Sequence, residues 1–137
     1  MNNYDPNLKP FFAHGGKLLG YQGWSDGMNS PLNHIAYYKE VAKVVGGEGT
    51  LSKSHRLFLI PGMEHCGGGE GTGTFNLLAE VDNWVVTGKP PDSIPASRVR
   101  DGKVDRTRPL CPYPKQAVYS GRGSTDDAAN FSCAVVK

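Results

Sequence analysis

Two short apolar segments on either side of a helix-like segment most constrain how this chain folds. Residues 17–23 and 55–61 are each long enough for one strand, and the second is apolar at most positions, as in strands buried on both faces. Between them, Ser30-Pro31 is a typical helix start, and apolar residues then recur at helical spacing up to Val45. This order predicts a β-α-β unit with two parallel strands.

A second helix is predicted over residues 74–87, where Leu78, Val81 and Val85 line one face. Residues 1–92 thus form a βαβα unit of the α/β class. Two parallel strands cannot make a stable covered sheet alone. We therefore expect the remaining strands to come from sequence outside this chain or from another chain.

The tail, residues 93–137, has a different composition. Asp101-Gly102 predicts a type I′ turn in a short hairpin near residues 98–105. The prolines and glycines that follow predict mostly irregular coil.

The composition argues against several classes of partner. The 137 residues carry a net charge of only +2, and no run of Lys or Arg suggests binding to nucleic acid or to an anionic membrane. No apolar stretch approaches the roughly 20 residues that span a bilayer. The first five residues lack signal-peptide character, which is consistent with a fragment of a secreted protein as well as with a cytosolic protein.

The chain has three cysteines, Cys66, Cys111 and Cys133, so at least one has no partner within it. Cys111 and Cys133 both lie in the loop-rich tail, and we expect them to pair. Three reduced thiols are the alternative. A zinc site with His65 is disfavoured because the close-spaced ligand pairs of structural zinc sites are missing, and no metal site is predicted.

Asp26 follows the first predicted strand and His65 follows the second. Taken singly, each could be an ordinary turn or loop residue. Together they lie at the carboxyl ends of the strands, where ligands bind in open α/β sheets. An acid and then a histidine is the chain order that follows the serine of an α/β-hydrolase triad. We therefore predict His65 as general base and Asp26 as the acid that orients it, whereas His34 and His55 are expected to be structural.

The serine of such a triad is not convincingly present. Residues 23–27 match the pattern G-x-S-x-G around Ser25, but the acid of that scheme lies between the serine and the histidine. After Asp26, the carboxylates before His65 are Glu40, Glu48 and Glu64, and none of them ends a strand. Ser25 is therefore disfavoured as nucleophile. The chain is predicted to be the carboxy-terminal βαβα portion of an α/β-hydrolase fold.

The glycines of residues 67–73 lack the Lys-Ser/Thr of a phosphate-binding loop and the full dinucleotide fingerprint. They are expected to let the backbone turn tightly around His65. They also argue against a third interpretation, an unrelated α/β oxidoreductase.

Five sequence blocks, in order along the chain, resemble the tannase and feruloyl esterase family. They are residues 15–19, 23–26, 61–69, 106–114 and 127–133. The resemblance implies secreted or periplasmic serine hydrolases with an α/β-hydrolase fold and a large lid domain, which cleave esters of phenolic acids such as galloyl or feruloyl esters.

The resemblance also implies roles for particular residues. Asp26 and His65 match the acid and base of the family's triad. Cys66 would pair with a cysteine beside the nucleophile, outside this chain, and Cys111 with Cys133. The family's calcium site lies in the lid, so no cofactor is expected in this chain, and its partner would be the upstream half of the same enzyme. Residues 27–31 are more polar than usual in the family.

Two hypotheses follow for the function. The first is an esterase segment that binds a phenolic ester but is inactive alone, because it lacks the nucleophile. The alternative is a non-catalytic binding or interaction module that retains the last strands of the fold.

Overall fold

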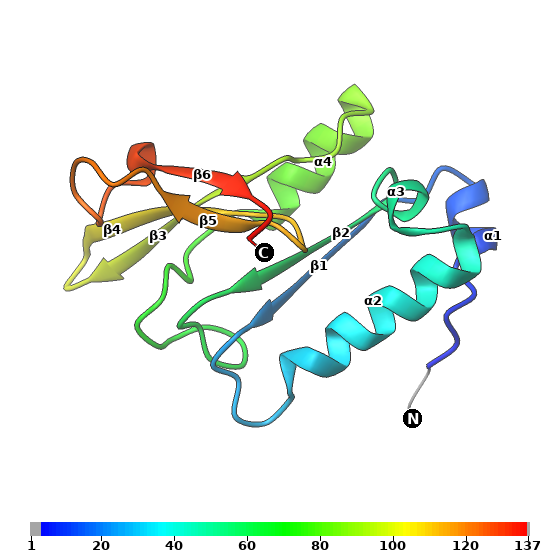
Figure 1. Cartoon of the computed structure of the whole chain (residues 1–137), viewed down its shortest axis with the longest axis horizontal. Coiled ribbons are helices and arrows are strands. Elements are labelled where there is room, and N and C mark those ends of the chain that lie inside the picture. Colours follow the sequence, from blue (N-terminus) through cyan, green and yellow to red (C-terminus); the bar gives the residue numbers. More distant parts are fainter. Residues whose placement is uncertain (1–3, 137) are drawn as a thin grey trace.

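A parallel pair of strands forms the centre of the computed structural model, which describes residues 4–136 (Figure 1). β1 (Leu18–Gly23) pairs with β2 (His55–Ile60) without interruption, from Leu18 opposite His55 to Gly23 opposite Ile60. Both strands lie where the sequence predicts them. The carboxyl ends of the two strands therefore meet at one edge.

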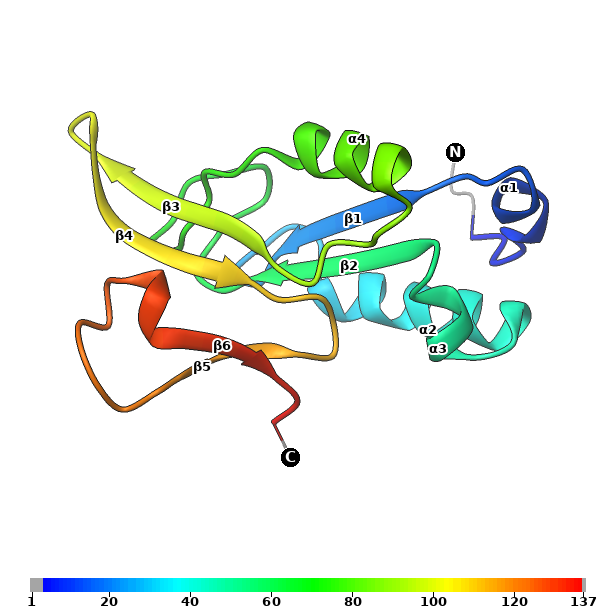
Figure 2. The same ribbon diagram turned by 90° about the horizontal axis from the view of Figure 1, so that it is seen from above.

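Helices cover both faces of this pair (Figure 2). α2 (Pro31–Val45) and the short α3 (Glu48–Leu51) connect the strands on one face, and α4 (Leu77–Thr87) lies on the other. Ser30 Oγ accepts a hydrogen bond from Leu32 N at 3.3 Å and caps α2, as predicted. α4 begins three residues later than predicted because Asn76 is its N-cap, with Oδ1 accepting from Ala79 N at 3.1 Å. The short helices α1 (Lys9–Ala13) and α3 were not predicted.

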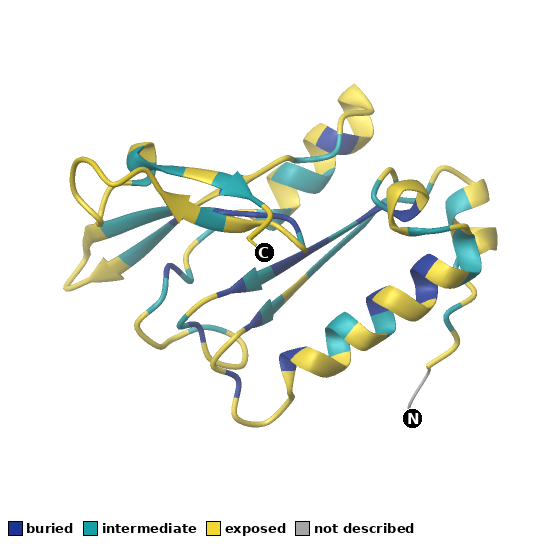
Figure 3. Cartoon of the chain, viewed as in Figure 1, coloured by how far each residue is buried: buried dark blue, intermediate teal, exposed yellow. Residues whose placement is uncertain are grey.

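β2 is mostly buried (Figure 3). Its side chains contribute to two hydrophobic clusters, one on each face. Leu57 packs against Tyr38 and Val41 of α2. Phe58 and Ile60 belong to the other cluster, with Met63, Ile94, Ala96 and Leu110. This division follows from the alternation of side chains along a strand. Ile94 and Leu110 come from the tail, so the tail shares a core with the βαβα unit.

The tail contains more regular structure than the sequence predicts. β3 (Ile94–Arg100) and β4 (Lys103–Leu110) form a hairpin well beyond residues 98–105. β5 (Gln116–Tyr119) and β6 (Phe131–Ala134) form a second antiparallel pair, preceded by a 3₁₀ turn at Ala128–Asn130. The prediction of mostly irregular coil was therefore wrong for these segments.

The hairpin extends past two prolines because these face each other across the ladder. Pro95 lies opposite Pro109, so the two residues without an N–H meet at one position of the ladder. The register shifts at a second position, between Arg98 and Val99. The turn itself is as predicted. Asp101 and Gly102 have φ angles of 49° and 74°, as a type I′ turn requires.

Two backbone connections attach the tail to the βαβα unit, and a disulfide closes the tail on itself. Tyr113 N donates to Leu57 O at 2.7 Å beside a bridge between Phe58 and Pro112, which covers the outer edge of β2. Ser97 bridges to Thr74 ahead of α4. A disulfide joins Cys111 to Cys133, confirming the predicted pair.

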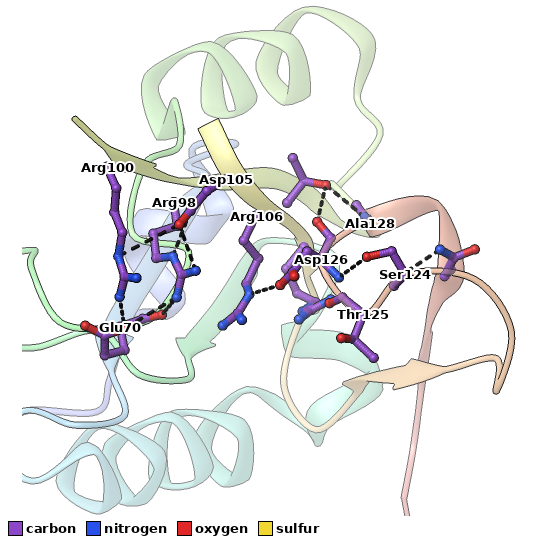
Figure 4. Close-up of polar contacts among 12 residues, drawn as sticks. Glu70, Arg98, Arg100, Asp105, Arg106, Ser124, Thr125, Asp126 and Ala128 are labelled. Carbon is purple, nitrogen blue, oxygen red and sulfur yellow. Dashed lines mark hydrogen bonds and ion pairs between the residues drawn. The ribbon is translucent and has the colours of Figure 1, made fainter. Parts of the chain in front are cut away.

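Ion pairs also hold the hairpin against the glycine-rich loop (Figure 4). Arg98 donates two hydrogen bonds to Asp105, at 2.8 and 2.9 Å, which lowers the pKa of that carboxyl. Glu70, in the glycine-rich loop, receives hydrogen bonds from Arg98 and Arg100. Exposed ion pairs contribute little stability. They mark where the loop after His65 lies against the hairpin.

His55 is a fully buried histidine at the first position of β2, at the opposite end of that strand from His65. Its ring packs against Tyr38 with the centroids 5.0 Å apart, and among residues 4–136 neither ring nitrogen has a hydrogen-bond partner. Burial, and secondarily the nearby His34, lowers the pKa of His55 to about 4. The folded protein therefore contains His55 in its neutral form at neutral pH.

We expect this histidine to make stability depend on pH. Between about pH 6.5 and pH 4 the unfolded chain binds a proton at His55 that the folded chain excludes, so stability falls as the pH is lowered. The shift from 6.5 to about 4 corresponds to roughly 3 kcal/mol. Urea unfolding of His55→Leu should show a flatter dependence over this range, whereas the exposed control His14→Leu should keep the original slope. Equal slopes in His55→Leu and the unaltered chain would contradict this assignment.

The disulfide gives a second prediction. Its residues are 22 apart, so closing this loop in the unfolded chain should stabilise the fold by about 3 kcal/mol. The double variant Cys111→Ala/Cys133→Ala should therefore unfold at lower guanidinium concentration, and Cys66→Ala should not. Thiol titration of the denatured, unreduced chain should detect one thiol, and finding three would contradict the pairing.

Candidate active site

Asp26 and His65 lie on consecutive loops at the carboxyl ends of β1 and β2. His65 Nδ1 donates a hydrogen bond to Asp26 Oδ2 at 2.8 Å, so the contact predicted from the sequence is present. The loops converge because pairing continues beyond the strands. Trp24 N donates to Ile60 O at 2.9 Å, and Ser25 N donates to Met63 O at 3.0 Å.

Gly23 makes this convergence possible. A Cβ atom at Gly23 would lie 2.0 Å from Glu64 O and 2.4 Å from Met63 O, closer than atoms can approach. The backbone before Asp26 therefore packs directly against the backbone before His65. Only glycine fits at this position.

The side chain of Asp26 is buried and fully hydrogen-bonded. Oδ1 accepts from Met28 N at 2.8 Å and from Asn29 N at 2.9 Å. Oδ2 accepts from His65 and from Gln22 Nε2 at 2.6 Å. The bond from Asn29 N, followed by the bond from His65, lowers the pKa of Asp26 to about 2 against the opposing effect of burial. The carboxylate is thus ionised at neutral pH.

His65 is oriented by this carboxylate and open on its other side. Because Asp26 is ionised, Nδ1 carries the ring proton and Nε2 presents a lone pair. The side chain is 47% exposed, and Nε2 has no hydrogen-bond partner within residues 4–136. A hydroxyl group that approaches from solvent or from another segment can reach it.

The glycine-rich loop after His65 folds back on the end of β2. Gly71 N donates to Gly62 O at 3.0 Å. Gly69 has φ of 76°, and a Cβ atom there would lie 2.2 Å from Gly62 O. The tight turn expected of these glycines is therefore present.

Ser25 is exposed, and among residues 4–136 no hydrogen bond joins its hydroxyl to His65. His65 Nδ1 instead donates its hydrogen bond to the neighbouring residue, Asp26. Nothing in this geometry pairs Ser25 with the base.

Sequence reasoning missed Gln22 and Asn29, which both contact the acid. Gln22 is the one polar residue of β1 apart from Tyr21, and it stands four positions before Asp26. Asn29 belongs to the polar run at residues 27–31. A polar residue at the end of an otherwise apolar strand, next to a candidate acid, was the signal available for Gln22.

Within residues 4–136, no group of three or more His, Cys, Asp or Glu side chains is arranged to hold a metal ion. No helix in that part of the chain is long and apolar enough to cross a membrane. Cys66 is exposed and has no disulfide partner there, so its pairing with an outside cysteine stays a prediction.

A cavity of about 720 Å³ lies beside the two loops. Trp24, Pro61 and Gly62 of these loops line it, together with Leu59 and Tyr113. Neither Asp26 nor His65 lines the cavity. The cavity therefore does not by itself define where a reacting group would lie.

A buried carboxylate bonded to a histidine, each after one of two adjacent parallel strands, is the arrangement of acid and base in α/β-hydrolases. The family model described as "Tannase and feruloyl esterase" matches residues 1–134. The chain belongs to this family.

Individual relatives agree with this assignment. The chain is 42% identical over 131 residues to mono(2-hydroxyethyl) terephthalate hydrolase of Piscinibacter sakaiensis, covering 93% of this chain and 21% of that protein. It is 34% identical over 146 residues to feruloyl esterase B of Aspergillus niger, covering 95% of this chain and 28% of that protein.

Solved structures show the same fold. Feruloyl esterase B from Aspergillus oryzae superposes with a TM-score of 0.86 at 33% identity, over 96% of this chain and 29% of that one. Tannin acyl hydrolase from Aspergillus niger, at 22% identity, shares the fold with a TM-score of 0.82, over 96% of this chain and 25% of that one. The chain thus spans between a fifth and a third of the length of these relatives.

The close approach at Gly23 gives a direct test of how the site is assembled. Gly23→Ala should push the two loops apart and destabilise the fold by about 1–3 kcal/mol, the usual range for overpacking. Gly27→Ala is the matched control, because a Cβ atom at Gly27 meets nothing within 4 Å. Guanidinium unfolding measures both variants. If they are equally stable, the contact between the loops is not as described.

Proposed function

We propose that this chain supplies the base and orienting acid of a serine carboxylic-ester hydrolase that acts on esters of phenolic acids. The nucleophilic serine would come from polypeptide outside these 137 residues. One observation carries the proposal. His65 is held through Nδ1 by a buried, ionised Asp26 at 2.8 Å, while Nε2 is left available on the exposed side.

The roles follow from this geometry. As the serine Oγ attacks the ester carbonyl carbon, Nε2 of His65 takes up the hydroxyl proton. Asp26 stabilises the imidazolium, because its Oδ2 already accepts the Nδ1 proton. When the tetrahedral intermediate collapses, Nε2 returns the proton to the departing alkoxide, which leaves as an alcohol.

The second half of the reaction uses the same atoms. Nε2 takes a proton from water as the water oxygen attacks the acyl-serine. It then returns that proton to the serine as the carboxylic acid departs. The base is thus regenerated in each half.

The relatives support the class of substrate. The names of the feruloyl esterase and of the terephthalate hydrolase both place the ester on an aromatic acid. Feruloyl or galloyl esters are the corresponding proposal here. Any lid and its calcium ion would lie on the same outside polypeptide as the serine.

The disulfide supports a location in an oxidising compartment. Disulfides persist in oxidising compartments, and Cys111–Cys133 is bonded. We therefore place the whole protein outside the cytoplasm, secreted or periplasmic, with Cys66 bonded to a cysteine near the serine.

Hydrolysis of methyl ferulate tests the function. A longer polypeptide that includes these residues should turn over the ester, and His65→Ala and Asp26→Asn should each lower kcat by about 10⁴-fold. The 137-residue chain alone should show no turnover above background, because it lacks a placed nucleophile. His14→Ala and Ser25→Ala are controls that should retain activity.

Two outcomes would contradict the proposal. Turnover by the isolated chain that disappears in Ser25→Ala would make Ser25 the nucleophile. Binding of the ester without turnover in the longer polypeptide, unchanged by His65→Ala, would favour a non-catalytic binding module.

A further inference from the structure

Gln22 is a half-buried residue of β1 whose side chain reaches the acid of the site. In the parallel ladder it lies opposite Leu59 of β2, so its backbone is held by the pairing of the two central strands. Its Nε2 lies 2.6 Å from Asp26 Oδ2 and 3.3 Å from Asn29 O.

Both partners of Nε2 are acceptors. A carboxylate oxygen and a carbonyl oxygen can each take one of the two hydrogens of an amide NH₂ group. The opposite amide orientation would bring the Gln22 carbonyl against an ionised carboxylate. The chemistry therefore fixes the orientation and makes Gln22 a donor to Asp26.

The bond from Gln22 ends on the oxygen that also faces His65. Oδ1 of Asp26 is held by Met28 N and Asn29 N, and Oδ2 is shared by Gln22 and His65. Four donors match the roughly four lone-pair sites of a carboxylate. The two backbone donors already limit rotation of the carboxylate. The distinct effect of Gln22 is to draw part of the negative charge of Oδ2 away from the imidazole.

The side chain of Asn29 does not duplicate this effect. Its Nδ2 lies 3.3 Å from His65 Nδ1, but Nδ1 uses its proton on Asp26 and has no lone pair to accept a hydrogen. Asn29 supports the acid through its backbone N–H and through the carbonyl that receives Gln22.

We propose that Gln22 is a positioning residue that acts through Asp26 and sets how strongly the acid attracts the proton of the general base. The catalytic consequence rests on the function proposed above, whereas the effect on the Asp26–His65 bond does not. Without Gln22, Oδ2 would carry more charge toward His65, and the imidazolium would be stabilised more strongly.

The first experiment needs no activity. In the longer polypeptide, the Nδ1–H proton of His65 should give a downfield ¹H NMR signal at low temperature, identified by its loss in His65→Ala. In Gln22→Met, which keeps the length of the side chain but removes the donor, this signal should move further downfield. Gln116→Met, the same change at the other glutamine of the chain, should leave it in place.

Other outcomes of this experiment overturn the proposal. An unchanged signal in Gln22→Met would mean that Gln22 does not influence the Asp26–His65 bond. Loss of the signal in a variant that remains folded would mean that Gln22 holds the carboxylate in place rather than sharing its charge.

The second experiment measures kcat/KM against pH in the longer polypeptide. Losing a hydrogen bond to an ionised carboxylate can move the pKa of a group that shares the same oxygen by up to about 1 pH unit. The acidic limb of the Gln22→Met profile should move to higher pH by about that amount, with KM unchanged. A merely structural role would lower stability and leave the limb where it is, which would overturn the proposal.

The two experiments separate the two hypotheses. If the NMR signal moves but ester hydrolysis does not depend on His65, the proposed function fails and the role of Gln22 in the hydrogen-bond network stands. If hydrolysis depends on His65 but neither the signal nor the limb moves, the function stands and the role of Gln22 fails.

Discussion

A carboxylate is costly to hold away from water unless donors surround it, and the site of this protein is organised around one such group. Asp26 is buried and accepts four hydrogen bonds from a strand residue, two loop N–H groups and a histidine. The donors from Gln22, Met28 and Asn29 belong to β1 and its own loop, whereas the donor from His65 is in place only if β1 and β2 pair in their observed register. The ionised acid then fixes the ring orientation and tautomer of His65.

Residues of the tail support β2 and the loop that carries His65. The disulfide joins the end of β4 to β6, and Tyr113 N closes the outer edge of β2. Glu70 connects the loop after His65 to Arg98 of the hairpin. The tail is therefore part of the scaffold of the site, which explains why it shares a hydrophobic cluster with β2.

The central unit could be predicted from the sequence because its signals are local. Apolar runs bounded by glycines, the Ser30-Pro31 helix start and the Asp101-Gly102 turn each depend on a few neighbouring residues. Asp26 and His65 could be placed together because both follow parallel strands. The full length of the hairpin could not be predicted, because it depends on Pro95 lying opposite Pro109 across the ladder. Gln22 was missed for a similar reason. Its polar side chain near the end of β1 was a signal in the sequence, but its contact with Asp26 depends on how the loop after β1 turns.

The proposed function requires His65 to activate a serine that lies outside these 137 residues. Labelling of the longer polypeptide with a fluorophosphonate, followed by mass spectrometry of its peptides, tests this claim most directly. The reagent phosphonylates a serine only when a base activates it. The account predicts one labelled serine outside residues 1–137, with labelling lost in His65→Ala. A label on Ser25, or labelling that persists without His65, would contradict it.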